Sequence, residues 1–260
     1  MANLKPIHAS AIKYGRKSML AMRAFIDGTI GHEETPAKTL GTLAHMAILE
    51  PDRFAGECVV YDGGGTRASK DYKEFAAAHD GARILKADEM SRVVSIRDAV
   101  MHCIPAAELI VACEHEVKVA WEDPAYGPAA GRIDLLGDFV LADLKTAANI
   151  EPRSFTRQAF GMGYFHQLAW YRYAAPRTTV KIVAVESSPP HDVAIYTVPG
   201  MYLDVFYRQA ASIAARYREC EATGYFPGAV EVEQELDIEP WMLDGEGAAD
   251  GLDEIEAAGL

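Results

Sequence analysis

The chain has 260 residues, of which 50% are hydrophobic and 24% are charged. This composition excludes a wholly disordered, collagen-like or coiled-coil protein, and the length suits one large domain or two small ones. The formal net charge is −13, but no lysine or arginine follows Arg218, whereas acidic residues are frequent after residue 230. Because the rest of the chain is nearly neutral, its acidity does not exclude a polyanionic partner that binds to a local basic surface.

The sequence contains no signal for a membrane or for export. No segment approaches the roughly 18 uninterrupted apolar residues of a transmembrane helix, and residues 1–6 lack the apolar core of a signal peptide. The cysteines form no CxxC pair, so we expect neither a zinc knuckle nor a disulfide framework. They are Cys58, Cys103, Cys113 and Cys220. We therefore expect a cytoplasmic protein with no membrane partner.

The first half of the chain is predicted to be helical. Apolar residues at helical spacing predict helices over residues 8–29, 37–50 and 88–104, and Pro51 is expected to end the second of these. The glycines at 63–65 lack the Gly-Lys-Ser/Thr sequence that follows in a phosphate-binding P-loop, so a plain loop is the better interpretation. A polar helical segment that contains Arg67, Lys70 and Lys73 follows this loop.

Strands dominate the middle of the chain. Alternating or apolar runs predict strands over residues 114–121, 129–136, 139–146, 180–186 and 193–198. Helices are expected over residues 152–162, 164–175 and 200–223. This order predicts a mixed α/β (α+β) core with helical decoration at the N-terminus.

The two strands on either side of Gly137-Asp138 place acidic and basic residues together. If these two residues form the turn of a hairpin, Arg132 lies opposite Asp143, and Asp134 is a diagonal neighbour of Asp143 at roughly 7–8 Å. Carboxylates at that distance can bind one divalent cation, and Lys145 shares their face. The other face is then entirely apolar and belongs to the core. Its residues are Ile133, Leu135, Val140, Ala142 and Leu144.

This charged face has a simpler interpretation, because acids and bases on a solvated strand usually form surface ion pairs. The acid-x-lysine spacing is also weak evidence by itself. It occurs at residues 71–73, 116–118 and 143–145, and only at 143–145 does a preceding strand place another aspartate beside it. From the hairpin alone, both interpretations stay open.

Several short runs together resemble a known family. They are Gly131-Arg132-Ile133-Asp134, Asp143-Leu144-Lys145-Thr146, the Gln-x-x-x-Tyr run of residues 167–171 and the histidine-containing run of residues 40–51. This ordered set resembles the PD-(D/E)XK nuclease superfamily, and within it the RecE-type exodeoxyribonucleases (the exonuclease VIII family, often phage-encoded). The resemblance extends to residues 225–228 and 240–241. It implies a restriction-endonuclease-like core, in which helices flank a central mixed sheet, as a single domain over residues 1–243. The acidic residues 244–260 are expected to form a mobile tail.

The resemblance assigns roles to the hairpin residues. Asp134 and Asp143 would bind the metal, and the backbone carbonyl of Leu144 would add a further oxygen. Hard oxygen ligands suit Mg²⁺, with Mn²⁺ as a substitute. Lys145 would orient or activate the attacking water and stabilise charge on the phosphate.

Four more residues match family positions. Gln167 and Tyr171 share one helix face, which borders the active site in the family, although a tyrosine in an ordinary amphipathic stripe is the simpler alternative. His45 matches a metal-binding histidine, although a lone histidine on an apolar helix is more often a core residue. Glu116 matches an acidic position that binds a second metal or only accepts hydrogen bonds.

The candidate DNA contacts are basic. They comprise Arg67, Lys70 and Lys73 after the glycine loop, Arg132 on the hairpin, and Lys13, Arg16, Lys17 and Arg23 on the first helix. A run of charges is usually only a solvated helix face. Arg132 could instead hold the carboxylate of Asp143 in place.

The resemblance implies a Mg²⁺-dependent exonuclease that degrades one strand of linear duplex DNA, 5′ to 3′, in the cytoplasm of a bacterial host. The resulting 3′ overhang would serve a RecT-like single-strand annealing protein, and the enzyme would form a homo-oligomeric ring. Two alternatives are a catalytically silent DNA-binding scaffold and a RecB-like nuclease of different polarity. The sequence lacks the cysteines that a RecB-like iron–sulfur cluster requires. It also lacks a GxGxxG, P-loop or GxSxG motif that would indicate a small-molecule enzyme.

Overall fold

The computed structural model describes residues 4–31 and 33–236. The predicted acidic tail and the Pro240-Trp241 part of the family resemblance lie outside these residues. Within them, no helix combines the length and the apolar character needed to cross a membrane.

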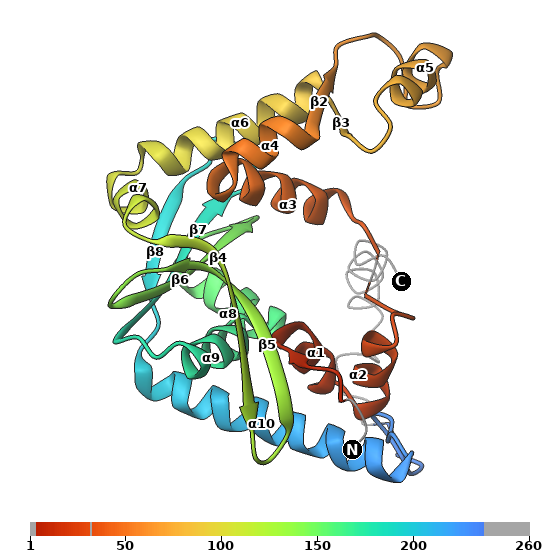
Figure 1. The fold of residues 1–260 in the computed structure, drawn as a ribbon, viewed down its shortest axis with the longest axis vertical. Helices are drawn as coiled ribbons and strands as arrows, with labels where there is room; N and C mark the ends of the chain where they lie inside the picture. The colour runs from red at the N-terminus through yellow and green to blue at the C-terminus, as the bar shows by residue number, and fades with distance from the viewer. Residues whose placement is uncertain (1–3, 32, 237–260) are drawn as a thin grey trace, which may run out of the picture.

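A mixed sheet forms the centre of the fold, as the sequence predicts (Figure 1). Its order is β1 (Ile7–His8), β5 (Gly127–Leu136), β6 (Val140–Ala147), β7 (Thr179–Glu186) and β8 (Val193–Thr197), and β4 (Glu114–Asp123) pairs with β5. β1–β5 and β6–β7 are parallel pairs, and β4–β5, β5–β6 and β7–β8 are antiparallel pairs. The short strand β1 has no periodicity of its own and is not predicted.

Helices cover both faces of this sheet. One apolar core lies beneath α1 (Ala9–Gly15), α2 (Met19–Ile26), α8 (Pro152–Met162), α9 (Tyr164–Ala174) and α10 (Gly200–Thr223). A second core lies beneath α3 (Pro36–Leu49), α6 (Ala87–His102) and α7 (Ile104–Val111). Figure 1 shows the sheet between these two groups of helices. The flanked-sheet architecture expected from the sequence is therefore present.

The first predicted helix is wrong, and the second is followed directly by a helix that the sequence does not predict. The helix expected over residues 8–29 is two helices, because the Ser18 side chain caps a new one by accepting a hydrogen bond from the Ala21 amide. Gly15 lets the first of them approach α10, since a Cβ there would lie 2.4 Å from Ile213. Pro51 ends α3 as predicted, but it also starts α4 (Pro51–Glu57), because proline suits the first turn of a helix.

An arm that the sequence does not predict as a sheet projects beyond α3 and α6 in Figure 1, and its buried residues Cys58 and Leu85 share an apolar cluster with these helices. β2 (Cys58–Tyr61) and β3 (Arg83–Lys86) form a two-stranded parallel sheet. Between them lies α5 (Lys70–Ala78), which has no buried residue and lies at the far end of the arm in Figure 1. The predicted polar helix is thus confirmed.

The hairpin register differs from the prediction by two residues. Leu136 pairs with Leu141, and Leu135 pairs with Ala142. Residues 137–139 join the strands, and a 2.8 Å hydrogen bond from the Gly137 amide to the Val140 carbonyl closes the turn. The turn is therefore centred one residue later than the assumed Gly137-Asp138, and Arg132 lies opposite Lys118 on β4 rather than opposite Asp143.

The predicted division into an apolar and a polar face is also wrong in part. Ile133 packs in the core under α9, whereas Leu135 packs in the core under α3 and α6. The strands change face at Glu116, a non-glycine residue with φ of 55°, where the β4–β5 pairing is interrupted. Because helices cover both faces, Leu141 and Asp143 are buried, and the simple surface-ion-pair interpretation does not apply to Asp143.

Candidate active site

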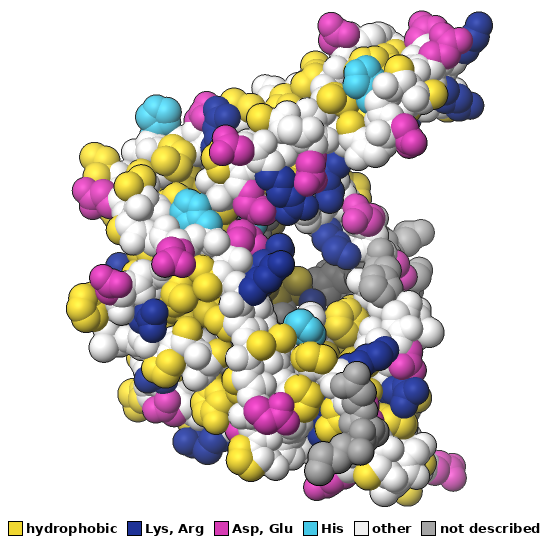
Figure 2. All heavy atoms as spheres, in the orientation of Figure 1, with side chains coloured by type: hydrophobic (Ala, Val, Ile, Leu, Met, Phe, Trp, Pro, Cys, Tyr) yellow, Lys and Arg dark blue, Asp and Glu magenta, His cyan; other side chains and the backbone are white. Residues whose placement is uncertain are grey.

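The predicted site residues gather in a cleft where β5 and β6 diverge. Their backbone pairing covers only residues 135–136 and 141–142, so the strand segments before and after it are free to separate. The cleft has a volume of about 870 Å³, and its lining includes His45, Asp134, Lys145, Gln167 and Tyr171. Figure 2 shows the surface hollowed near the centre, with lysine and arginine side chains at its edge.

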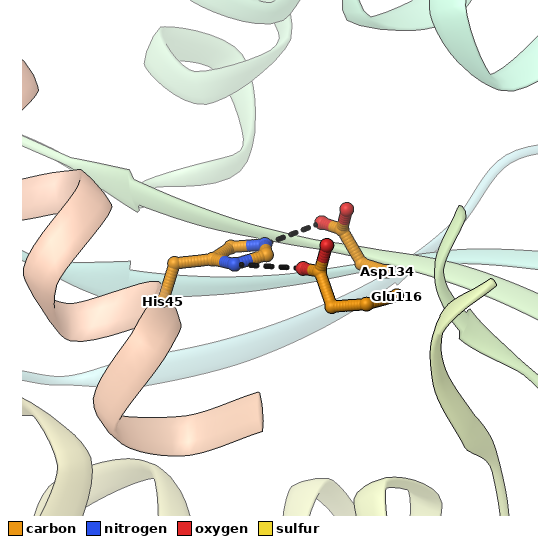
Figure 3. A group of neighbouring side chains, drawn as sticks. All are labelled: His45, Glu116 and Asp134. Carbon is orange, nitrogen blue, oxygen red and sulfur yellow. Dashed lines mark ion pairs between the residues drawn. The ribbon is translucent and has the colours of Figure 1, made fainter. Parts of the chain in front are cut away.

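Three of the predicted metal ligands meet in this cleft (Figure 3). His45 extends from α3, Glu116 from β4 and Asp134 from β5. His45 Nε2 lies 2.9 Å from Asp134 Oδ2, and His45 Nδ1 lies 3.2 Å from Glu116 Oε1. One donor atom from each residue lies within 4.8 Å of the others. His45 thus lies between two carboxylates and is not a residue of the apolar core.

The two carboxylates favour a charged imidazole. Burial lowers the pKa of His45, but the hydrogen bonds to Asp134 and Glu116 outweigh burial and raise this pKa to about 9. Burial likewise raises the pKa of Asp134, but the hydrogen bond from His45 and the nearby Lys145 ammonium hold it below its usual range. Without a metal, the imidazolium therefore supplies the positive charge between the two carboxylates.

A second set of polar residues adjoins the first. Asp143 is 1% exposed, and its Oδ2 lies 2.5 Å from the Lys145 ammonium. Its Oδ1 accepts a 3.0 Å hydrogen bond from Gln167 Nε2. Burial and the Asp134 carboxylate raise the pKa of Asp143. Burial opposes the charge of Lys145, but the two aspartates raise its pKa and keep the ammonium charged.

The backbone of Leu144 connects the two sets. Its amide donates a 2.9 Å hydrogen bond to Asp134 Oδ2, the oxygen that also faces His45. This bond takes the place of a strand-to-strand backbone bond where β5 and β6 diverge. The Leu144 side chain is buried in the core, so the strand is held in place while the Asp134 carboxylate faces the cleft.

Helix α9 closes the site from the other face of the sheet. Besides Asp143, Gln167 Nε2 contacts the Tyr171 hydroxyl at 3.4 Å. Burial raises the pKa of Tyr171 to about 12, so its hydroxyl stays protonated. Gly131 is required beneath this ring, because a Cβ there would lie 2.5 Å from Tyr171 Cε1. Tyr171, on the predicted face of α9, therefore packs directly on Gly131, the first residue of the Gly131–Asp134 motif.

The predicted DNA-contacting residues are only partly brought to the cleft. Arg132 lines it, but its Nε lies 2.5 Å from Glu116 Oε2, so the expectation that it holds Asp143 is wrong. Arg67 pairs with Glu89 at 2.6 Å and Lys70 with Glu74 at 3.6 Å. Together with Lys73 these residues belong to the arm, and none of them lines the cleft.

Basic residues on the first helix lie closer to the site. Lys13 lines a second cavity of about 660 Å³, which shares Gln167 and Tyr171 with the cleft. Burial lowers the pKa of Lys13, and the positive charges of Lys17, Arg16 and Lys38 lower it further. Two other residues of that group contact protein groups. Arg16 donates a 2.9 Å hydrogen bond to the Phe160 carbonyl, and Arg23 pairs with Asp27 at 2.5 Å.

Sequence reasoning missed Lys38, Lys118 and Tyr164. Lys38 lines the cleft, Lys118 lines the second cavity, and Tyr164 lines both. Lys118 stands directly opposite Arg132, and like charges in that arrangement destabilise a sheet. The spacing of 164, 167 and 171 on one helix face could have identified Tyr164.

Comparison with known proteins identifies the family. A family model described as a PDDEXK-like domain of unknown function (DUF3799) matches residues 9–235. The chain belongs to this family. The resemblance to the PD-(D/E)XK superfamily inferred from the short motifs is thereby confirmed. No curated protein matches the chain.

Solved structures resemble this PDDEXK-like chain to different degrees. A suspected exonuclease from Eubacterium rectale is 14% identical, with a TM-score of 0.63, over 92% of this chain and 91% of the other. A phage-related exonuclease from Haemophilus somnus is 12% identical, with a TM-score of 0.41, over 85% and 96%. The alkaline exonuclease of Laribacter hongkongensis is 11% identical, with a TM-score of 0.32, over 84% and 91%. At 14% identity, the likeness to the Eubacterium rectale protein shows the fold alone.

The donor atoms of this PDDEXK-like site fit a divalent cation. Both Glu116 carboxylate oxygens and Asp143 Oδ2 are buried, and within the described residues they have ion-pair contacts but no hydrogen bond of normal geometry. The carboxylate oxygens suit Mg²⁺ or Mn²⁺, whereas an imidazole nitrogen is more typical of transition-metal sites. The four cysteines are free, and none of them lines the cleft.

Proposed function

We propose that the protein is a metal-dependent exodeoxyribonuclease that hydrolyses phosphodiester bonds at the ends of linear duplex DNA. The observation that carries this proposal is the junction of two sets of residues in one cleft. His45, Glu116 and Asp134 offer ligands for a divalent cation, and the buried Asp143–Lys145 pair lies beside them. The PDDEXK-like family and the exonuclease names of the structures with this fold support the same reaction.

The protein groups divide the catalytic work. A cation held by His45, Glu116 and Asp134, with Asp143 beside them, would polarise the scissile phosphate and lower the pKa of a bound water. Lys145, whose side chain is 18% exposed, can donate hydrogen bonds to that water or to a phosphate oxygen and stabilise negative charge as it develops. Gln167 fixes the Asp143 carboxylate through its 3.0 Å hydrogen bond.

The surroundings of the cleft favour a polyanionic substrate. Lys13 and Lys118 line the cavity that adjoins the catalytic residues, and Lys38 lines the cleft itself. Within residues 4–31 and 33–236 these three lysines form no salt bridge, and like charges that gather in this way are unfavourable until a polyanion neutralises them. This arrangement supports a nucleic acid over an uncharged substrate.

The finer properties rest on the resemblance to RecE-type exonucleases. By that resemblance we propose degradation of one strand, 5′ to 3′, with Mg²⁺ as the resident metal and Mn²⁺ as a substitute. We also propose that the 3′ overhang is passed to a RecT-like annealing protein in the cytoplasm of a bacterial host. The annealing protein would bind the single strand only after the exonuclease has exposed it.

The test uses linear duplex labelled at the 5′ end of one strand or at its 3′ end, with closed circular DNA as the control. With Mg²⁺ we expect the 5′ label to be released as mononucleotides or short products before the 3′ label, and the circle to stay intact. Ca²⁺ should bind without supporting turnover, because its looser coordination positions water poorly. Early release of the 3′ label favours the RecB-like alternative, and no release with any metal favours the silent scaffold.

A further inference from the structure

Within the described residues, the ammonium of Lys145 forms one ion pair, with the Asp143 carboxylate at 2.5 Å. A lysine side chain is flexible and its charge is compact, so a single ion pair leaves the direction of its remaining N–H groups undetermined. Because Asp143 is buried, this ion pair also draws the ammonium towards the sheet. A second contact is needed to hold it where it can reach a substrate in the cleft.

Tyr164 supplies that contact. Its ring centroid lies 4.9 Å from Lys145 Nζ, which is within the range of a cation–π interaction. Tyr164 lines both the cleft and the second cavity, so the ring borders the route between them. Within the described residues, no protein group forms a hydrogen bond with its hydroxyl, and burial raises the pKa of Tyr164. The contact that the structure shows for Tyr164 is therefore made by its ring.

The position of this ring is fixed by the start of α9. Gly163 has φ of 79° and ends α8, so α9 begins at Tyr164 itself. Positions 164, 167 and 171 follow one face of α9. Along that face Tyr164 contacts Lys145, Gln167 bonds to Asp143, and Tyr171 covers Gly131. One helix thus holds three successive parts of the site.

We propose that Tyr164 is a positioning residue, whose ring confines the Lys145 ammonium between Asp143 and the open cleft. This role rests on the proposed nuclease function, and it assigns a task to a residue outside the motifs of the sequence. The ring acts through Lys145, so its removal should lower the rate of the chemical step and leave duplex binding unchanged.

A double-mutant cycle tests this role. We expect Tyr164→Leu to lower the single-turnover cleavage rate about tenfold to thirtyfold, the range of a desolvated cation–π contact. Tyr164→Phe keeps the ring and should restore most of that rate. In a Lys145→Ala background, Tyr164→Leu should cause no further loss. The control is Tyr202→Leu, the same change at an exposed position of α10. Melting temperature and duplex affinity in EDTA are measured for every variant.

A second readout does not depend on activity. The ring current of an aromatic side chain shifts the NMR signals of a neighbouring methylene, so the Lys145 Cε protons should be shifted upfield in the parent and in Tyr164→Phe, but not in Tyr164→Leu. An active parent whose rate is unchanged by Tyr164→Leu overturns the inference alone. The inference is also overturned if Tyr164→Leu lowers the cleavage rate by the same factor in the Lys145→Ala background as in the parent. A Tyr164→Phe variant that cleaves as slowly as Tyr164→Leu overturns it as well. A parent that cleaves no DNA overturns the proposed function, and the positioning role with it.

Discussion

At the scale of single residues, His45 has an unusual position between two carboxylates. The pKa of His45 is raised from 6.5 to about 9, so the folded protein retains a proton that the unfolded chain loses as the pH rises. The stability gained from this imidazolium is fully present below the unfolded pKa and is lost as the pH rises through the folded pKa. This gain in stability is expected only in the metal-free protein, because a bound cation would take the place of the proton.

This linkage gives a prediction for the protein in EDTA. His45→Gln removes the imidazolium, so the parent should be more stable than the variant by an amount on the order of 2 kcal/mol below about pH 6.5. The difference in the free energy of unfolding should shrink as the pH rises towards about 9. Urea denaturation across this range measures it. A difference that does not change with pH would show that His45 is uncharged in the folded protein.

A second prediction concerns the stability of a Lys145 variant, for which the structure and the predicted hairpin register give different answers. The predicted register places Lys145 and Asp143 on a polar face, where substitution leaves stability intact. In the structure Asp143 is 1% exposed, so Lys145→Ala leaves a buried carboxylate without its cation. We expect a loss of about 3 kcal/mol of stability in addition to the loss of cleavage. Thermal unfolding measures this loss, and an unchanged melting temperature would contradict the buried ion pair.

The motifs reveal the candidate residues but not all of their contacts. The order of His45, Asp134, Asp143, Lys145 and Gln167 could be matched to a family from the sequence. The structure brings four of them to the lining of one cleft and buries Asp143 behind Lys145 and Gln167. The contact of His45 with Glu116 could not be predicted, because it joins a helix to a strand far along the chain. No local spacing encodes such a contact.

At the scale of elements, the approach of α9 to β5 depends on one glycine. Gly131 lies beneath the Tyr171 ring, where a Cβ would overlap Cε1 at 2.5 Å. Gly131→Ala must displace this ring and with it the neighbouring Gln167. We expect a destabilisation of about 1–3 kcal/mol and slower cleavage, measured by denaturation and by single-turnover kinetics.

The matched control is Gly161→Ala on α8, where a Cβ would meet no atom within 4 Å. Alanine favours a helix over glycine by up to about 1 kcal/mol, so this variant should be as stable as the parent or more stable. If the two alanine variants have equal stability, the close packing of Tyr171 on Gly131 is not present in solution.

Periodicity predicted the longer elements well, because both strands of the hairpin and the helices α8, α9 and α10 repeat their apolar residues at regular spacing. It could not find β1, whose pairing with β5 involves only Ile7 and His8. The predicted hairpin register is wrong because local geometry sets the position of the turn, which is centred one residue later than Gly137-Asp138. The change of face at Glu116 depends on one backbone angle, and the residue types around it do not reveal that angle.

At the scale of the whole molecule, we expect a homo-oligomer. An enzyme that stays on one duplex through many cleavage steps gains from enclosing it, and closed cyclic symmetry is the usual way to build a ring. Light scattering combined with size-exclusion chromatography measures the molar mass at the concentrations that support cleavage. A particle of about 28.3 kDa, the mass of a single chain, would contradict this expectation.

The central claim is that one cleft holds both the metal ligands and the catalytic lysine of a nuclease. The most direct test compares the parent with Asp143→Asn on end-labelled linear duplex, in Mg²⁺ and in EDTA. Asparagine keeps the shape of the buried side chain and removes its charge, so the variant should stay folded. We predict rapid cleavage by the parent in Mg²⁺, no cleavage in EDTA, and a rate about 10²–10³ lower for the variant, the usual effect of removing one electrostatic group from an active site. Cleavage by the parent in EDTA, or equal rates for the two proteins in Mg²⁺, would contradict the claim.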